Sequence, residues 1–431
     1  MRRCPRVRVS DVERYEAYKD SGIEWIGEIP QHWLISKGVR ALSVRYGYPF
    51  ESNRFSNTKG WPLIRIRDVG SKTTESLYDG EFVESARIEN GDILVGMDGE
   101  YKVARWEGHT ALLNQRVCAL ENSAVLLKDY LLYLMPEALR LINELTYGTT
   151  VKHLGAKDLN AMSLICPPID EQRAIADYLD AKTAKIDALV ADCEREVGLL
   201  REYRKAVISE AVTKGLDPDA PMKDSGIEWI GEIPERWLVR PSKTLFAEGK
   251  ELRRPDDEQC TASQKYGIIP QAQYIALENQ RMVAADKNLD AWKHVEPGDF
   301  VISLRSFQGG LELSSVSGCV TWHYIVLKGS HLVESPYYKY LFKTQKYIES
   351  LQRTCTYIRD GQDLRYSNFI QVPLPLPPRN EQVAIGAYLN AKTAEIDSLI
   401  EAKQSMADKL REYRKSLISE AVTGKFKVPG V

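Results

Sequence analysis

The sequence predicts an α+β protein in which two globular α/β domains are separated by two long antiparallel coiled-coil helices, with a pseudo-twofold internal repeat. Three observations predict this class. One block near the N-terminus recurs unchanged half-way along the chain, a second block with heptad spacing occurs twice, and the segments between these blocks share little identity.

The two repeated blocks have similar offsets. Lys-Asp-Ser-Gly-Ile-Glu-Trp-Ile-Gly-Glu-Ile-Pro stands at residues 19–30 and, without change, at residues 223–234. A longer block with many shared residues stands at 171–213 and at 381–423. Offsets of 204 and 210 residues are far longer than the units of about 20 to 50 residues that build solenoids. The chain is therefore a duplicated domain pair. Each half consists of a constant block, a variable segment and a second constant block.

The longer block has the apolar spacing of a coiled-coil seam. A helix of about 42 residues is about 60 Å long and is marginal in water by itself, so we expect the two copies to pair. Arg204, Lys403 and Arg414 are the charged exceptions to the apolar rule. The first seam consists of Leu179, Ile186, Cys193, Leu200 and Val207 with Thr183, Val190, Val197, Arg204 and Ala211; the second of Leu389, Ile396, Lys403, Leu410 and Leu417 with Thr393, Ile400, Ala407, Arg414 and Ala421.

Both helices have recognisable ends. A Pro-Pro pair precedes each helix and is followed by Asp170 in the first copy and by Asn380 in the second, both favoured N-cap residues. Gly215 and Gly424 suit the left-handed position that follows a helix. The predicted boundaries are an N-terminal extension at 1–18, a first variable domain at 19–166, the first helix at 167–215, a linker at 216–222, a second variable domain at 223–376, the second helix at 377–425 and a tail at 426–431.

Bulk composition is that of a globular protein, with 43% hydrophobic and 27% charged residues. The basic N-terminus lacks the apolar core of a signal peptide, so we expect a cytoplasmic protein. Its seven cysteines are scattered and never spaced as Cys-x-x-Cys, which favours reduced thiols. Because the formal net charge is −2, any attraction to nucleic acid must come from local basic patches or from partner subunits.

The variable domains contain similar strands with different loops. In residues 61–67, apolar and basic residues alternate, which predicts a strand with Arg65 and Arg67 on one face. Residues 91–99 and 298–306 each predict a turn, a short buried strand and a polar loop.

Basic, amide and hydroxyl side chains in these domains are suited to binding DNA. Arginine, glutamine and asparagine form paired hydrogen bonds with base edges, whereas lysine and small hydroxyls suit phosphates. A solvated surface position is the alternative for each residue singly, so the prediction applies to the set. The predicted DNA-contacting residues are Arg45, Tyr48, Arg54, Arg65, Arg67, Asp98, Lys102, Asn114, Gln115, Arg116, Thr149, Thr150, Lys152 and His153 in the first domain, and Lys250, Arg253, Arg254, Lys265, Tyr266, Arg305, Ser306, Gln308, His323, Tyr324, Arg359 and Arg365 in the second.

Motifs of catalysis are missing from the sequence. It contains no phosphate-binding Gly-x-x-x-x-Gly-Lys-Ser/Thr loop, no Gly-x-Gly-x-x-Gly turn, no His-Glu-x-x-His helix and no Gly-x-Ser-x-Gly elbow. An Asn/Asp-Pro-Pro-Tyr stretch, typical of amino-methyltransferases, is also missing. Residues 254–258 faintly resemble a nuclease carboxylate cluster, but a charged, solvated loop is the preferred interpretation. The histidines have no ligand spacing, so we predict neither a catalytic nor a metal site.

The repeated motifs resemble those of a known family. The opening Tyr-Lys-Asp-Ser-Gly-Ile-Glu-Trp-Ile-Gly-Glu-Ile-Pro at residues 18–30, and Pro-Pro-x-x-Glu-Gln at 167–172 and 377–382, are similar to the specificity subunits of type I restriction-modification systems. The resemblance extends over about residues 18 to 425, and residues 114–115 and 148–154 resemble the family's first recognition domain. The first 17 residues depart from the family opening.

This resemblance implies a function for each part. Each variable segment would be a target recognition domain that reads one half of a split, asymmetric DNA site, and the helices would set the gap. Two methyltransferase subunits would dock on the helices and shared blocks, joined by two restriction (translocase-nuclease) subunits. S-adenosylmethionine, ATP and magnesium would bind those partners and not this non-catalytic chain. The family also implies that the N-terminal block lies near the end of the second helix.

Two other classes of function stay open. A protein-interaction scaffold could use the same helices and two ligand-binding domains without DNA, although the basic loops argue against it. A self-sufficient methyltransferase or nuclease is disfavoured by the missing motifs.

Overall fold

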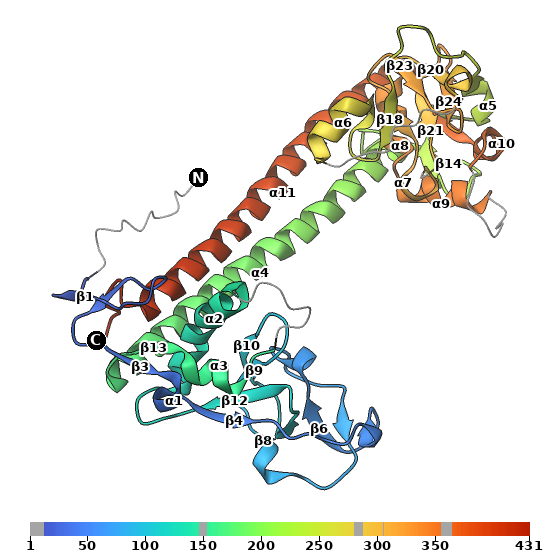
Figure 1. Ribbon diagram of the computed structural model, residues 1–431. Coiled ribbons are helices and arrows are strands. Elements are labelled where there is room, and N and C mark those ends of the chain that lie inside the picture. Colours follow the sequence, from blue (N-terminus) through green and yellow to red (C-terminus); the bar gives the residue numbers. More distant parts are fainter. Residues whose placement is uncertain (1–12, 146–152, 280–287, 305, 355–363) are drawn as a thin grey trace. The chain divides into compact units, whose positions relative to one another are not determined.

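The computed structural model describes residues 13–145, 153–279, 288–304, 306–354 and 364–431 (Figure 1). The chain forms two compact units, one of Met1–Cys193 with Ser405–Val431 and one of Glu194–Gln404. We call them unit 1 and unit 2. Each contains one variable domain and a portion of both long helices.

Unit 1 is built on two sheets. The four-stranded sheet has the order β10-β9-β12-β4 with antiparallel neighbours, and the five-stranded sheet has the order β5-β7-β6-β11-β8, in which β6 and β11 are parallel. The strands are β1 (Tyr18–Asp20), β2 (Glu28–Pro30), β3 (Leu34–Lys37), β4 (Ser43–Tyr46), β5 (Phe55–Ser56), β6 (Trp61–Ile64), β7 (Leu77–Tyr78), β8 (Arg87–Ile88), β9 (Ile93–Gly96), β10 (Val103–Arg105), β11 (Ala111–Leu113), β12 (Val117–Glu121) and β13 (Ser163–Cys166); the helices are α1 (Gly38–Ala41), α2 (Lys128–Leu145) and α3 (Ala156–Ala161), with 3-10 turns at Ser52–Arg54, Ile66–Asp68 and Glu84–Ala86.

Unit 2 repeats the four-stranded sheet, in the order β17-β24-β21-β22. Smaller two-stranded sheets replace the five-stranded sheet of unit 1. The strands are β14 (Met222–Asp224), β15 (Glu232–Pro234), β16 (Leu238–Arg240), β17 (Phe246–Gly249), β18 (Cys260–Ser263), β19 (Gly267–Pro270), β20 (Lys293–Val295), β21 (Phe300–Ile302), β22 (Glu312–Leu313), β23 (Gly318–Val320), β24 (Ile325–Gly329) and β25 (Leu374–Leu376); the helices are α5 (Ser242–Leu245), α6 (Gln271–Glu278), α7 (Ser306–Gly309), α8 (Ser335–Leu341), α9 (Gln345–Arg353) and α10 (Tyr366–Phe369), with a 3-10 turn at Leu289–Ala291.

The duplication therefore extends into the variable segments. The order β4-β12-β9-β10 in unit 1 is equivalent to β17-β24-β21-β22 in unit 2, although the two segments share little identity. The predicted turns at Gly91 and Gly298 have φ values of 89° and 98°, and each precedes a fully buried strand. The α+β class and the internal repeat are confirmed.

The two long helices are α4 (Ile169–Lys214) and α11 (Arg379–Val422), green and red in Figure 1. Their predicted seam positions are buried, as in Leu179, Thr183, Leu389 and Thr393, or half-buried, as in Leu200. Within unit 2, Arg204 lies against Asp397 and Glu196 forms an ion pair with Lys403. A lower number on α4 meets a higher number on α11, so the helices pair antiparallel there. These ion pairs also explain why charged residues interrupt an apolar seam.

Both helices start two residues earlier than the predicted N-caps imply. Helices α4 and α11 begin at Ile169 and Arg379, not after Asp170 and Asn380 as N-caps. The reason is that the preceding proline carbonyls already accept helical hydrogen bonds, from the N–H of Gln172 at 3.0 Å in the first copy. The predicted C-terminal glycines are confirmed, with φ values of 79° at residue 215 and 69° at residue 424.

One predicted strand is too long. Strand β6 ends at Ile64, and the backbone then turns into the 3-10 segment Ile66–Asp68. Asp68 causes this turn, because its Oδ2 accepts the N–H of Arg65 at 2.9 Å while its own N–H donates to the carbonyl of Arg65 at 2.8 Å. The expectation that Arg65 and Arg67 share one face of a strand is therefore wrong.

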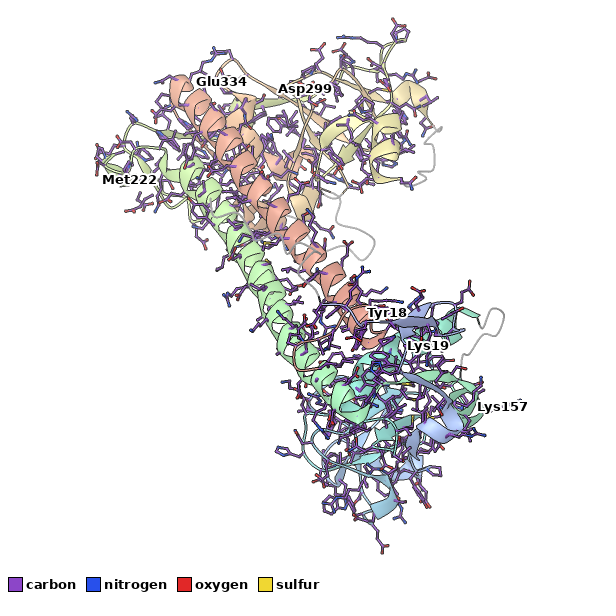
Figure 2. All side chains as sticks on the ribbon, turned by 90° about the vertical axis from the view of Figure 1, so that its left-hand side faces the viewer. Tyr18, Lys19, Lys157, Met222, Asp299 and Glu334 are labelled. Carbon is purple, nitrogen blue, oxygen red and sulfur yellow. The ribbon has the colours of Figure 1, made fainter. Side chains whose placement is uncertain are left out.

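The N-terminal block packs against the end of α11 within unit 1. Lys425 Nζ donates to the carbonyls of Ile26 at 2.7 Å and Glu28 at 2.6 Å. The N–H of Lys427 donates to the carbonyl of Glu13 at 2.7 Å, and Figure 2 shows Tyr18 beside the last turns of α11. The expected proximity of the N-terminal block to the end of the second helix is confirmed.

Candidate nucleic-acid interface

A buried glutamine ties the start of each long helix to its variable domain. In unit 1, Gln172 Oε1 accepts the N–H of Leu127 at 2.8 Å, and its Nε2 donates to two main-chain carbonyls at 2.7 and 2.8 Å. In unit 2, Gln382 Oε1 accepts the N–H of Glu334 at 2.9 Å, and its Nε2 donates to two carbonyls at 3.0 and 2.9 Å. Both side chains are fully buried. The motif Pro-Pro-x-x-Glu-Gln thus joins helix and domain.

The preceding glutamate binds the indole of a buried tryptophan. Glu171 Oε2 accepts the Trp33 Nε1–H at 2.9 Å, and Glu381 Oε2 accepts the Trp237 Nε1–H at 3.0 Å. Both tryptophans follow the repeated opening block and are fully buried. The start of each long helix is therefore bonded to the segment that directly follows the opening block.

A pair of tyrosines connects each variable domain to both long helices. Tyr130 donates its hydroxyl to the Val422 carbonyl at 2.8 Å, and Tyr337 donates to the Val212 carbonyl at 2.7 Å. Both tyrosines are completely buried, and each satisfies a carbonyl at the end of a long helix where no helical N–H remains.

The second tyrosine of each pair contacts the other long helix. Tyr133 donates to Asp180, whereas Tyr340 donates to Asn390 Oδ1 at 2.8 Å. Burial, and then the bond to Asp180, raise the pKa of Tyr133 to about 12. Sequence reasoning missed these tyrosines. The signal is a Tyr-x-x-Tyr-Leu pattern at residues 130–134 and 337–341, within segments of otherwise low identity.

Several predicted DNA-contacting residues of unit 1 meet at one end of its two sheets. Strands β4 and β9 run in the same direction on either side of β12, and the turn that follows β11 leads directly into β12. Isolated bridges pair Tyr48 with Asn114 and Asp98 with His153, and the N–H of Asn114 donates to the Ile64 carbonyl beside Arg65. We call this set the first recognition edge: Tyr48, Arg65, Asp98, Lys102, Asn114, Gln115, Arg116 and His153.

Asp98 holds two other side chains of the first recognition edge in place. Its carboxylate accepts from His153 Nδ1 at 2.7 Å and forms an ion pair with Arg116. Partial burial opposes ionisation, but these two hydrogen bonds outweigh it, and the pKa of Asp98 lies below its usual value. The side chain of Asp98 is 15% exposed, whereas those of His153 and Arg116 are each 58% exposed. The geometry therefore makes Asp98 a support for two accessible side chains.

Three other predicted residues of unit 1 make separate contacts. Arg45 lies within β4 and is ion-paired with Glu121 at 2.9 Å and with Asp92 at 3.2 Å. Arg54 pairs with Glu51, and Arg67 Nη2 donates to Ser76 Oγ at 2.9 Å while its side chain stays exposed. Arg45 and Arg54 are thus engaged by neighbouring carboxylates, and Arg67 by a neighbouring hydroxyl.

The equivalent end of the unit 2 sheet also collects predicted residues. Strand β24 lies between β17 and β21, so the residues before β24 lie next to those that follow the other two strands. Ser306 is buried and its hydroxyl accepts the N–H of Ser303 at 2.8 Å, so this hydroxyl stabilises the loop. We call this set the second recognition edge: Lys250, Ser306, Gln308, His323 and Tyr324.

The other described candidates of unit 2 bond to neighbouring side chains or main chain. Arg254 pairs with Glu251 at 2.7 Å and with Glu296 at 3.1 Å, and Glu278 Oε1 accepts from both Lys265 at 3.3 Å and Tyr266 at 2.9 Å. The remaining two are Arg253, whose N–H donates to the Trp292 carbonyl, and Arg365, whose N–H donates to Asn368. Thr149, Thr150, Lys152, Arg305 and Arg359 lie outside the described residues.

Residues 254–258 are only partly a solvated loop. The Asp257 side chain is 6% exposed and lies 2.8 Å, Oδ2 to Nδ1, from the fully buried ring of His294. The other ring nitrogen of His294 lies 3.3 Å from Glu296 Oε1. The prediction of a solvated loop is therefore wrong for Asp257. Its carboxylate turns inward because it is hydrogen-bonded to the buried imidazole of His294.

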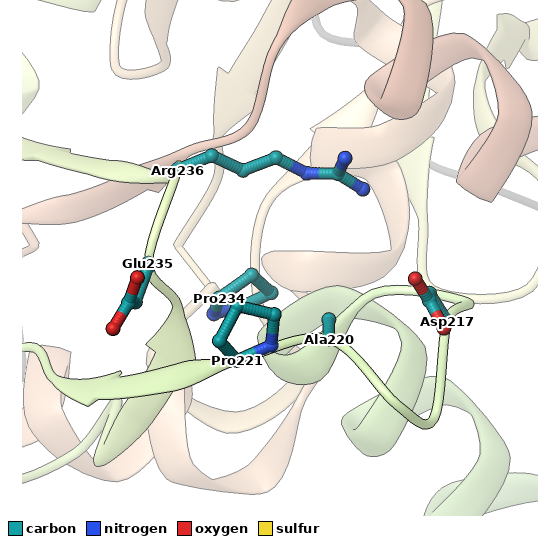
Figure 3. A pocket seen from close by; sticks show the side chains of 6 residues that line it. All are labelled: Asp217, Ala220, Pro221, Pro234, Glu235 and Arg236. Carbon is teal, nitrogen blue, oxygen red and sulfur yellow. The ribbon is translucent and has the colours of Figure 1, made fainter.

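A pocket of about 390 Å³ lies beside the connection between α4 and β14 (Figure 3). Within it, the N–H of Glu235 donates to the Pro221 carbonyl at 2.8 Å, and Arg236 pairs with Glu381 at 2.9 Å. The predicted DNA-contacting residues do not line this pocket, which is formed by the linker after α4 and by the end of β15 with the two residues that follow it. Its lining residues are Asp217, Ala220, Pro221, Pro234, Glu235 and Arg236.

Comparisons with known proteins agree with the geometry. Residues 42–192 match the family described as "Type I restriction modification DNA specificity domain". The chain is 36% identical over 242 residues to the type I restriction enzyme EcoBI specificity subunit of Escherichia coli, a match over 55% of this chain that spans half the length of that relative. It is 24% identical over 439 residues to the putative MjaX specificity subunit of Methanocaldococcus jannaschii, covering 94% of this chain and 96% of the relative.

Solved structures show the same fold. A chain from a study of complex assembly and conformational transition of the type I R-M system has a TM-score of 0.66 at 14% identity, covering 91% of this chain and 98% of that chain. The HsdS subunit from Thermoanaerobacter tengcongensis has a TM-score of 0.53 at 15% identity, covering 92% and 98%. With the duplicated frame and its constant motifs, these matches show that the chain is similar to the specificity subunits of type I restriction-modification systems, over residues 42–192 by the family model and over most of its length by the archaeal relative.

Proposed function

We propose that this chain determines the DNA sequence recognised by a type I restriction-modification complex. The observation that carries the proposal is one frame that is built twice from equivalent contacts and presents two chemically different recognition edges. Each edge would contact one half of a bipartite, asymmetric duplex site, and the paired helices would set the spacing between the halves.

The proposal assigns catalysis to partner subunits. Two methyltransferase subunits and two restriction (translocase-nuclease) subunits would bind this chain. S-adenosylmethionine would bind the methyltransferase, and ATP with magnesium the translocase. The net charge of −2 supports this division, because additional positive charge from partners would strengthen phosphate attraction.

Exposed apolar residues on the long helices support two docking sites for one kind of partner. Leu189 on α4 and its repeat equivalent Leu399 on α11 are 47% and 46% exposed, and Tyr203 and its equivalent Tyr413 are 50% and 48% exposed. Contiguous exposed apolar surface marks sites of interaction with other proteins, and Tyr203 and Leu399 line the same shallow pocket. A surface present twice suits two copies of a methyltransferase.

The complex would act on DNA in the cytoplasm. Among the helices of the described residues, none combines the length and the apolar composition needed to cross a bilayer.

The proposal is tested by mapping methylated bases in cells that contain the methyltransferase with or without this chain. We expect methylation at a split, asymmetric sequence only when the chain is present. Methylation at the same sites without it would refute the proposal. Electrophoretic mobility of duplex DNA with the purified complex separates this function from a scaffold, for which no sequence-dependent shift is expected.

A further inference from the structure

The loop before β24 is the structural counterpart of the loop before β12. Val117 pairs with Gly96, the last residue of β9, and Ile325 pairs with Ile302, the last residue of β21. Residues 322–324 therefore occupy the place of residues 114–116 of the first recognition edge. Since β24 is flanked by β17 and β21, this loop lies in the middle of the second recognition edge.

This loop presents a stacked aromatic pair. The rings of Trp322 and His323 are 3.4 Å apart between centroids, with an angle of 29° between their planes. Trp322 is 42% exposed, unlike the tryptophans that hold the frame. The next residue, Tyr324, packs against a buried cluster that contains Val320 and Val326.

Main-chain bonds hold the loop beneath the two rings. The N–H of Tyr324 donates to the Thr321 carbonyl at 3.0 Å, and Lys293 Nζ donates to the Tyr324 carbonyl at 2.7 Å. The aromatic pair is thus supported on a packed turn, with one face of the indole covered by the imidazole.

The two loops differ in the contacts that they can make. Asn114, Gln115 and Arg116 offer amide and guanidinium groups, which form directional hydrogen bonds with base edges. Trp322 and His323 offer aromatic faces, and exposing an indole to water is costly unless a ligand covers it. Aromatic faces stack on nucleobases, either in unpaired strands or at base steps that a protein opens.

We propose that Trp322 and His323 form a stacking site for a nucleobase in the half-site bound by unit 2. The inference rests on the proposed function and adds to it a mode of contact. Unit 1 reads bases by hydrogen bonds, whereas unit 2 opens a base step and covers a base with an aromatic face. Simple apolar contact with a thymine methyl group is the alternative, and it needs no aromatic ring.

The test uses the complex of this chain with its methyltransferase and a duplex that carries the methylation-mapped site. Affinity is measured by fluorescence anisotropy at several salt concentrations for wild type, Trp322→Ala, Trp322→Phe and Trp322→Leu. We expect Trp322→Ala and Trp322→Leu to weaken binding about 5- to 150-fold, with the dependence on salt unchanged, and Trp322→Phe to stay within about 3-fold of wild type. Thermal denaturation confirms that each variant is folded.

One control variant makes the outcome decisive. Gln115→Ala removes an amide from the first recognition edge. We expect it to weaken binding, which would show that the duplex contacts unit 1 in the same assay. Wild-type affinity of Trp322→Ala, equal rescue by leucine and phenylalanine, or a reduced salt dependence would each overturn the stacking site while leaving the proposed function intact. A wild-type complex that binds no duplex would overturn the proposed function itself.

Discussion

The guanidinium of Arg204 on α4 lies 2.8 Å, Nε to Oδ1, from the carboxylate of Asp397 on α11. The repeat equivalents, Arg414 on α11 and Asp187 on α4, form the same ion pair at the same distance. Each arginine occupies a position where the heptad pattern expects an apolar residue. A polar residue at a seam position restricts the register in which two helices pair, so we assign these pairs to register.

Reversing one charge tests this assignment. Asp397→Arg places two cations against each other, and we expect the free energy of unfolding to fall by about 1 kcal/mol, because the wild-type pair is 35% and 53% exposed and screened by water. The double variant Arg204→Asp with Asp397→Arg should recover most of that loss in denaturant titrations. Glu412→Arg, on an exposed position of α11, is the control. Equal effects of all three variants would contradict a role in register.

The buried glutamines should be costly to remove. Gln172→Ala leaves the Leu127 N–H without its acceptor, and we expect the free energy of unfolding to fall by about 2–3 kcal/mol. Gln382→Ala should cost a similar amount, since its bonds are equivalent. Chemical denaturation measures both, with the exposed Gln404→Ala as control. A loss as small as that of the control would mean that the motif does not join helix and domain.

The low pKa of Asp98 predicts an acid-sensitive edge. Its depressed pKa means that its hydrogen bonds from His153 and Arg116 stabilise the fold above the ordinary aspartate pKa of about 3.9, and that this contribution is lost as the pH falls through the folded value. Melting temperatures of wild type and Asp98→Asn should therefore differ most near neutral pH and converge in acid. A difference that is constant with pH would show that the carboxylate charge is not involved.

Glu312 in unit 2 predicts the opposite dependence. Its side chain is 4% exposed and lies 2.5 Å, Oε1 to Nζ, from Lys343, which also donates to the Gly309 carbonyl at the end of α7. Burial raises the pKa of Glu312 despite the lysine, so the folded state binds its proton more readily than the unfolded chain. The contribution of this group to stability is therefore lost as the pH rises through the folded value.

Removing the lysine should strengthen that dependence. Lys343→Met leaves a buried carboxylate unpaired, and we expect a loss of about 3–5 kcal/mol at neutral pH that shrinks as acid protonates Glu312. Thermal denaturation between about pH 4 and pH 8 measures this, with the exposed Lys346→Met as control. A loss that does not change with pH would contradict the assignment.

The helices and the duplication were predictable because their signals are local or periodic. Heptad spacing identified the seam, and the constant blocks identified the frame. The function of Glu171 and Gln172 was not predictable, because their partners are brought together only by tertiary folding. The strand through Arg65 was predicted too long because one carboxylate, that of Asp68, offers the backbone a competing turn.

The recognition edges were predictable only in part. Residue chemistry selected Asn114, Gln115 and Arg116, which the fold gathers, but it also selected Arg45, whose guanidinium is engaged by two carboxylates. Sequence alone does not distinguish an available arginine from a paired one. The same preference for hydrogen-bonding residues passed over Trp322, since an exposed tryptophan is recognised as such only in a structure.

Exchange of one variable domain tests whether each domain reads one half of the DNA site independently of the other. Residues 31–166 are replaced by the corresponding segment of a similar specificity subunit, and methylated bases are mapped across the genome of cells that contain the methyltransferase. Because each unit has its own contacts between helix and domain, we expect a new sequence in one half of the site and an unchanged sequence in the other half. A change in both halves would contradict this independence.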